Sequence, residues 1–124
     1  PTFCEIAGLP VPEWMDGTPL PQTDAAAAAQ GRDSVVTVWD SVHPNGTAIH
    51  LRTIHRDGWT CTTALPGTVH DGTEGELYCH AEDPLQRVNR WDDPSVRALR
   101  DDLVAACLAT LPEFSDPAPL AAPV

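Results

Sequence analysis

The stretch SVVTVWDSVHPNGTAIHLRTIHRDGWTCTTAL, residues 34–65, decides the fold. It contains three runs, 34–41, 48–56 and 59–65, that are rich in the β-branched and aromatic residues typical of strands. Asn45-Gly46 separates the first two runs and Asp57-Gly58 the last two. Both dipeptides favour tight turns between antiparallel strands. The stretch therefore predicts a three-stranded antiparallel meander.

Downstream, the pattern predicts a fourth strand and then helices. The run ELYCH, residues 76–80, follows a polar, glycine-rich loop at 66–75 and is a short fourth strand. Asp83-Pro84 and Asp93-Pro94 each place a capping carboxylate before a proline at the first helical position, so each should start a helix. The first helix has room for about one turn in 85–91. The second extends over 94–111, where apolar side chains recur at helical spacing: Val96, Leu99, Leu103, Cys107 and Leu111.

These elements predict an α+β fold, a small four-stranded antiparallel sheet packed by a carboxy-terminal helix. Three segments follow: 1–32, 33–111 and 112–124. In the first, residues 2–8 are expected to be the last turns of a helix with Gly8 at its C-cap, 9–21 an extended proline-rich linker, and 25–31 a connector that is at most transiently helical. The segment 112–124 follows a helix-ending proline and is expected to be a disordered tail.

Charge and composition exclude several classes of function. The chain carries 18 acidic residues against seven arginines and no lysine, for a net charge of −11. Such a surface repels phosphate backbones, so we expect no nucleic-acid partner. No apolar run reaches the length of a membrane span, so we expect no membrane partner. The four cysteines fit no disulfide or metal spacing and are expected to be free, mostly buried thiols, which leaves the compartment open with a slight preference for the cytoplasm.

The histidines and cysteines do not predict a metal site. The best set is Cys61, His70, Cys79 and His80, whose spacing matches no zinc module, and neighbours such as Cys79 and His80 on a strand point to opposite faces. The acidic loop 70–74 lacks the register of a calcium loop and is expected to be a solvated turn. His50 and His55 also straddle a strand, and we expect them at the surface or at the rim of a pocket.

Two stretches resemble the carboxy-terminal portion of the sulfatase family, arylsulfatase-like members of the alkaline-phosphatase superfamily. The first is PTFCEIAGLPVP, residues 1–12, followed by MDGTPLP at 15–21; it resembles the family's P-T-x-L-x-L-A-G-x-P-x-P and G-x-S-L-x-P. The second is GELYCHAEDPLQRVN, residues 75–89, which resembles G-E-L-Y-D-L-x-x-D-P-x-E-x-x-N. Cys79, His80 and Gln86 depart from the usual Asp, Leu and Glu, which puts local packing in doubt rather than the resemblance.

The resemblance implies that this chain is the carboxy-terminal subdomain of a larger sulfuric ester hydrolase, with residues 1–32 ending the large domain's last helix. Such enzymes cleave sulfate esters with a formylglycine nucleophile beside a divalent metal, usually calcium, and make the nucleophile in a C/S-x-P/A-x-R motif. None of the four cysteines has that context, so the chain is expected to hold no catalytic residue, no metal and no cofactor of its own. Its expected partner is the upstream catalytic domain of the same polypeptide.

The resemblance also assigns roles to individual residues. Tyr78 and Trp91 would be core aromatics, and Asp83 and Asn89 would shape the turn below the last strand. His70 and Asp71 are the candidate substrate-binding residues, at the rim of the parent's pocket. Two alternatives stay open: the tail of a phosphonate or phosphodiester hydrolase of the same superfamily, and a stand-alone binding module without catalytic activity.

Overall fold

The computed structural model describes residues 1–111, so the predicted tail at 112–124 lies outside the described residues. The chain divides into two compact units, one of residues 1–32 and one that begins at Asp33. In the part of the chain that the structure describes, no helix is long and apolar enough to cross a membrane.

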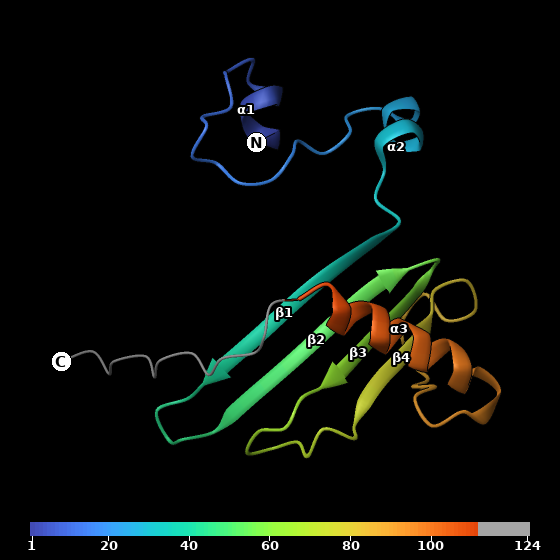
Figure 1. Ribbon diagram of the computed structural model, residues 1–124. Coiled ribbons are helices and arrows are strands. Elements are labelled where there is room, and N and C mark those ends of the chain that lie inside the picture. Colours follow the sequence, from blue (N-terminus) through green and yellow to red (C-terminus); the bar gives the residue numbers. More distant parts are fainter. Residues whose placement is uncertain (112–124) are drawn as a thin grey trace. The chain divides into compact units, whose positions relative to one another are not determined.

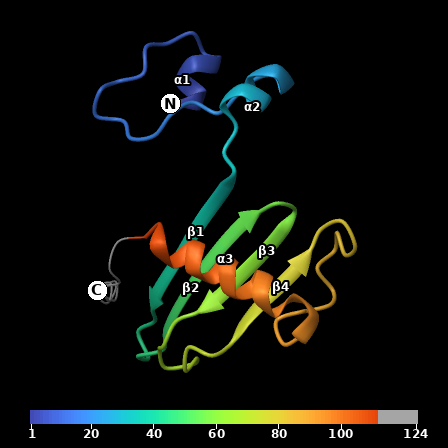
Figure 2. The same cartoon turned by 45° about the vertical axis from the view of Figure 1, so that its right-hand side comes forward.

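The second unit is a four-stranded antiparallel sheet with strand order β1-β2-β3-β4 (Figure 1). The strands are β1 (Ser34–Val42), β2 (Ala48–Arg56), β3 (Trp59–Ala64) and β4 (Gly75–Cys79). A 3-10 turn, η1 (Pro94–Val96), leads into the helix α3 (Arg97–Ala109), which crosses one face of the sheet (Figure 2). The predicted fold class is therefore confirmed.

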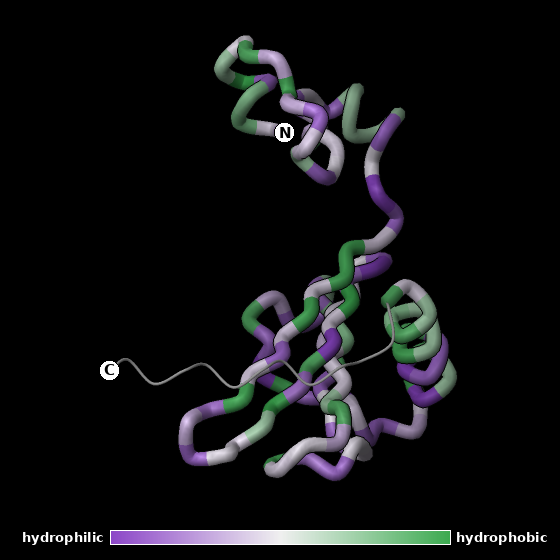
Figure 3. The backbone as a smooth tube through the Cα atoms, turned by 60° about the vertical axis from the view of Figure 1, so that its left-hand side comes forward, coloured by the Kyte–Doolittle hydropathy of each residue, from purple (hydrophilic) through white to green (hydrophobic). Residues whose placement is uncertain are grey.

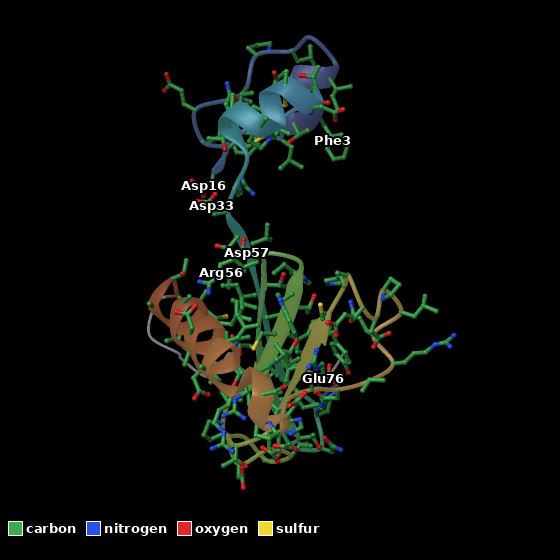
Figure 4. The ribbon with its side chains drawn as sticks, turned by 90° about the vertical axis from the view of Figure 1, so that its right-hand side faces the viewer. Phe3, Asp16, Asp33, Arg56, Asp57 and Glu76 are labelled. Atoms are coloured by element: carbon green, nitrogen blue, oxygen red, sulfur yellow. The ribbon has the colours of Figure 1, made fainter. Side chains whose placement is uncertain are left out.

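Both predicted tight turns are present. At the β1–β2 connection, Gly46 has a φ of +84°, and the N–H of His43 donates to the carbonyl of Thr47. At the β2–β3 connection, Asp57 and Gly58 both have positive φ, 51° and 75°, the conformation that a two-residue hairpin turn requires. Arg56, beside that turn (Figure 4), binds Asp102 of α3 and ties the hairpin to the helix.

The core lies between the sheet and α3. Strand alternation points Ile54, Cys61 and Leu77 towards the helix, which contributes Leu103 and Cys107, and all five are almost completely buried. Figure 3 shows that apolar and polar residues are mixed along the strands. We call this side of the sheet the helix face. Cys61, Cys79 and Cys107 are buried free thiols and Cys4 is partly buried, as predicted.

The other side of the sheet, the outer face, contains three rows of neighbours that extend over three or four strands. The rows are Val35-His55-Thr60-Tyr78, Thr37-Thr53-Thr62-Glu76 and Trp39-Leu51-Ala64. Tyr78 is thus on the face opposite α3 and only partly buried, so its assignment to the core was wrong. Its neighbour Leu77 occupies the core position instead, whereas Trp91 does pack against the core.

Two helix predictions also need correction. Residues 85–91 form no helix, because Gln86 has a φ of +52° and the Asp83 carboxylate accepts the N–H groups of Arg87 and Val88 in a turn. The second predicted helix is one turn shorter at its start, where Asp93 caps the 3-10 turn by accepting from Ser95.

The first unit contains two short helices and buries no residue of either. In α1 (Thr2–Ile6), the chain leaves the helix through Gly8 with a φ of +66°, as predicted. The alanine run, for which a connector with transient helix was expected, is helical as α2 (Asp24–Gln30). Alanine is the best helix former, and Thr23 caps the first turn by accepting from the N–H of Ala26. Phe3 on α1 is 86% exposed (Figure 4).

Candidate functional site

The two candidate substrate-binding residues lie in the loop between β3 and β4. His70 is partly buried, and its Nδ1 is 3.7 Å from Oε1 of Glu74. Asp71 is exposed, and its Oδ1 accepts hydrogen bonds from the backbone N–H and the hydroxyl of Thr73, at 2.9 and 2.7 Å. These bonds hold the pKa of the Asp71 carboxyl below its ordinary value. Oε2 of Glu74 in turn accepts the N–H groups of Asp71 and Gly72, so the loop is braced by its own carboxylates.

His70 lines a hollow beside the sheet. This hollow, of about 250 Å³, lies beside the outer face and is lined by Leu51, Thr62, Ala64, His70, Glu74, Gly75, Glu76 and Asn89. Its lining includes the carboxylates of Glu74 and Glu76 and the imidazole of His70. Glu76 is labelled in Figure 4. Two carboxylates repel a sulfate or phosphate ester, because like charges at close range are unfavourable in a partly buried site. The hollow therefore suits a neutral or cationic polar group better than a sulfate or phosphate group.

The residues considered for zinc are not brought together. Cys61 and Cys79 are buried on or beside the helix face, and His70 belongs to the β3–β4 loop. His80 is turned to the outer face, where its Nε2 is 2.6 Å from the Thr60 hydroxyl, and His55 Nδ1 contacts the same hydroxyl at 2.9 Å. Within residues 1–111, no three His, Cys, Asp or Glu side chains are grouped so that they could hold a metal ion.

A buried ionic cluster on the helix face was not predicted. Asp40 of β1 accepts from His50 Nδ1 at 3.0 Å and, with both carboxylate oxygens, from the guanidinium of Arg52 at 2.8 and 3.0 Å. His50 is 1% exposed and Arg52 5%, so the expectation of a surface or rim position was wrong for His50 and right only for His55. Burial alone would raise the pKa of Asp40, but hydrogen bonds from Arg52 and His50 outweigh it and lower the pKa.

The hairpin register contains the signal that would have revealed this cluster. With the turn centred on Asn45-Gly46, Asp40 and His50 are direct cross-strand partners, and Arg52 follows two residues later on the same face. The geometry is that of a structural ion cluster, with a bidentate guanidinium and an imidazole on one carboxylate.

The residues at 75–89 that carry the family resemblance have structural tasks. Gly75 has no room for a side chain, because a Cβ there would meet the ring of Trp91 and, at 2.5 Å, the carbonyl oxygen of Thr62. Asn89 closes the outer edge of β4: its Oδ1 accepts the N–H groups of Leu77 and Trp91, and its Nδ2 donates to the carbonyl of Gly75. Asp83 holds the intervening turn.

Comparison with known protein families finds no matching family, and comparison with curated protein sequences finds no match. Among solved structures, the chain is similar to a Bacteroides thetaiotaomicron sulfatase solved in work on the metabolism of multiple glycosaminoglycans. The TM-score is 0.47 and the sequence identity 13%. The match covers 88% of this chain and 23% of that one, so this chain spans less than a quarter of the sulfatase's length.

Removal of the Asn89 side chain tests whether it clamps the edge of the sheet. In Asn89→Ala, three hydrogen bonds to backbone groups are lost, and at about 1 kcal/mol each the free energy of unfolding should fall by roughly 1–3 kcal/mol. Asn89→Asp keeps the accepting oxygen and loses only the bond to Gly75, so it should fall between the wild type and the alanine variant. Urea denaturation followed by circular dichroism measures both, and equal stabilities of all three proteins would contradict the clamp.

Proposed function

We propose that this chain is the carboxy-terminal subdomain of a sulfatase-like hydrolase whose upstream part cleaves sulfate esters with metal-activated formylglycine. The observation that carries the proposal is the segment 75–89. Its matching residues Gly75, Asp83 and Asn89 occupy positions where a side chain clashes, a turn is capped and a strand edge is closed. A sequence signature that serves structure in this way marks a shared subdomain fold rather than a shared reactive group.

Sulfate ester hydrolysis requires reactive groups that we propose lie upstream of this chain. It needs an activated nucleophile and cationic groups that stabilise negative charge on the equatorial oxygens. No cysteine here has the nucleophile-forming context, and four of the seven arginines already bind carboxylates of this chain: Arg52, Arg56, Arg90 and Arg100. We therefore assign the nucleophile, the calcium ion and the catalytic cations to the upstream part, and derive no catalytic step for this chain.

The role proposed for this chain at the parent's pocket is limited to its rim. His70 lines a hollow with two carboxylates, which suits contacts to hydroxyl or amine groups of a substrate rather than to the ester being cleaved. The Asp71 carboxylate already accepts hydrogen bonds from Thr73 within its loop, so its proposed role is to hold the conformation of the loop.

An activity assay tests the proposal. The chain alone, shown to be folded, should hydrolyse no aryl sulfate, phosphate or phosphonate ester with calcium, magnesium or manganese added. The same chain expressed together with the upstream part of its gene should hydrolyse sulfate esters, and faster turnover of phosphonate or phosphate diesters would favour that branch of the superfamily. Turnover by the chain alone that is abolished in His70→Ala or Asp71→Asn would contradict the proposal.

A further inference from the structure

The two edge strands of the sheet, β4 and β1, differ in whether their outward backbone groups are hydrogen-bonded. At the β4 edge, the side chain of Asn89 and the N–H of Arg90 bind the outward backbone groups of Gly75 and Leu77. At the β1 edge (Figure 1), no backbone hydrogen bond beyond the pairing with β2 involves any residue of β1 within 1–111. An open edge is a template for another strand, and proteins usually block one with lysine, proline or a bulge.

None of those devices is present in β1. The strand SVVTVWDSV contains no lysine and no proline, and it pairs with β2 over nine consecutive residues without a bulge. Its one charge, Asp40, is bound by Arg52 on the helix face. Among the described residues of this unit, a long and nearly uncharged edge therefore remains.

The alternation of the ladder defines which groups face outward. His43 donates to Thr47 just outside the β1–β2 pairing, so in an antiparallel ladder the residues at odd positions of β1 bind β2. The N–H and C=O groups of the even positions then point away from the sheet: Ser34, Val36, Val38, Asp40 and Val42.

Large apolar side chains flank this edge on both faces. Val35 and Trp39 on the outer face are 47% and 61% exposed, and Val38 on the helix face is 45% exposed. A partner lying flat on one face would leave the other side uncovered. A strand added beside β1 would cover both.

We propose that the added strand is β1 of a second copy of this chain, paired antiparallel about a two-fold axis at Val38. In this register Val38 faces Val38 of the second copy and Val36 faces Asp40, so every outward backbone group meets an outward group and no like charges are opposed. The two sheets become one continuous sheet, with Trp39 of each copy beside Thr37 of the other. This pairing does not depend on the proposed function.

Charge opposes the association and gives it a recognisable salt dependence. Two copies each carry a net charge of −11. Screening shortens the range of this repulsion from about 10 Å at 0.1 M salt to about 3 Å at 1 M. The dimer should therefore become tighter as salt is added, whereas a dimer held by ion pairs would become weaker.

Sedimentation equilibrium of the chain at low and high salt is the first test. We expect a monomer–dimer equilibrium that shifts to the dimer at high salt, together with slower amide exchange at Val36 and Val38 as the protein concentration rises. Thr37 and Trp39, whose N–H groups bind β2, should exchange at the same rate at all concentrations. A monomer at high salt, or a dimer that salt dissociates, overturns the proposal.

Substitutions of Val38 test the register. Val38→Pro removes one outward N–H without loss of a bond to β2, so the fold should persist and the dimer be lost, while Val38→Thr, which keeps the N–H, should still dimerise. Val38→Lys and Val38→Asp should each be folded and monomeric, because like charges would face each other across the axis. An equimolar mixture of these two variants should form a heterodimer, and a mixture that stays monomeric overturns the proposal even if the proline variant does not fold.

Discussion

Replacement of Leu77 by alanine is expected to lower the free energy of unfolding by about 2–5 kcal/mol, the usual cost of emptying a buried leucine site. Leu77 has no exposed surface and packs with Ile54, Cys61 and Leu103 between β4 and α3. The free energy of unfolding of a small domain is only about 5–15 kcal/mol in total, so Leu77→Ala should remove a large share of it. The midpoint of urea denaturation in Leu77→Ala measures the loss.

The neighbouring residue provides a matched control for that substitution. Tyr78→Ala removes a larger side chain from the same strand, but on the outer face, where it is only partly buried. We expect a clearly smaller loss of stability than for Leu77→Ala. The reverse order would show that β4 presents Tyr78 rather than Leu77 to the helix, and that the register is shifted by one residue.

Loss of the Asp40 carboxylate is the second substitution with a large expected effect. Asp40→Ala takes the bidentate partner from Arg52, a side chain that is 6% exposed, and breaking one side of a buried ion pair typically costs about 3–5 kcal/mol. Asp40→Asn keeps the shape and one accepting oxygen, so its loss should be smaller. Thermal denaturation at neutral pH compares the two variants, and an unchanged melting temperature in Asp40→Ala would contradict a stabilising cluster.

The Asp40 carboxylate should also make the free energy of unfolding depend on pH in the acid range. The pKa of Asp40 is lowered in the folded protein, so its contribution is fully present above the unfolded pKa of about 3.9 and is lost as the pH falls through the folded value. Stability should therefore decline below about pH 4, and less steeply in Asp40→Asn. Part of the decline should remain, because a hydrogen bond from Ser95 and contact with Arg90 lower the pKa of Asp93 to about 2. An identical pH dependence of both proteins would exclude Asp40 as its source.

The sheet was predictable because its turns and strands carry strong local signals. β2 runs over Ala48–Arg56 as predicted, since Asn45-Gly46 and Asp57-Gly58 define both of its ends. The helix predicted over 85–91 is absent. Asp83 and Pro84 favour the start of a helix, but they do not reveal the positive φ at Gln86, which prevents the helix from continuing. Tyr78 was misplaced because one residue of shift on a strand moves a side chain to the other face, and its neighbours Leu77 and Cys79 are apolar as well.

The candidate site was less predictable than the fold. The sequence pattern placed His70 and Asp71 on the β3–β4 loop, but it could not show that Glu74 accepts the N–H of Asp71 or that His70 lines a hollow with Glu74 and Glu76. The Asp40-His50-Arg52 cluster was not predicted, because a single histidine or arginine in a sequence is normally expected at the surface. The pairing of His50 and Arg52 with Asp40 across the hairpin supplies hydrogen-bond partners for these polar groups in a buried position.

The buried thiols of the core have a consequence for chemical damage. Burial raises the pKa of Cys61 to about 11 and also raises that of Cys107, and oxidants and alkylating agents attack the thiolate rather than the thiol. The folded domain thus suppresses the reactive form of both sulfurs while α3 and the sheet keep reagents away from them. Sulfenic acid formation, the first and still reversible step of cysteine oxidation, should therefore be slow as long as α3 stays packed on the sheet.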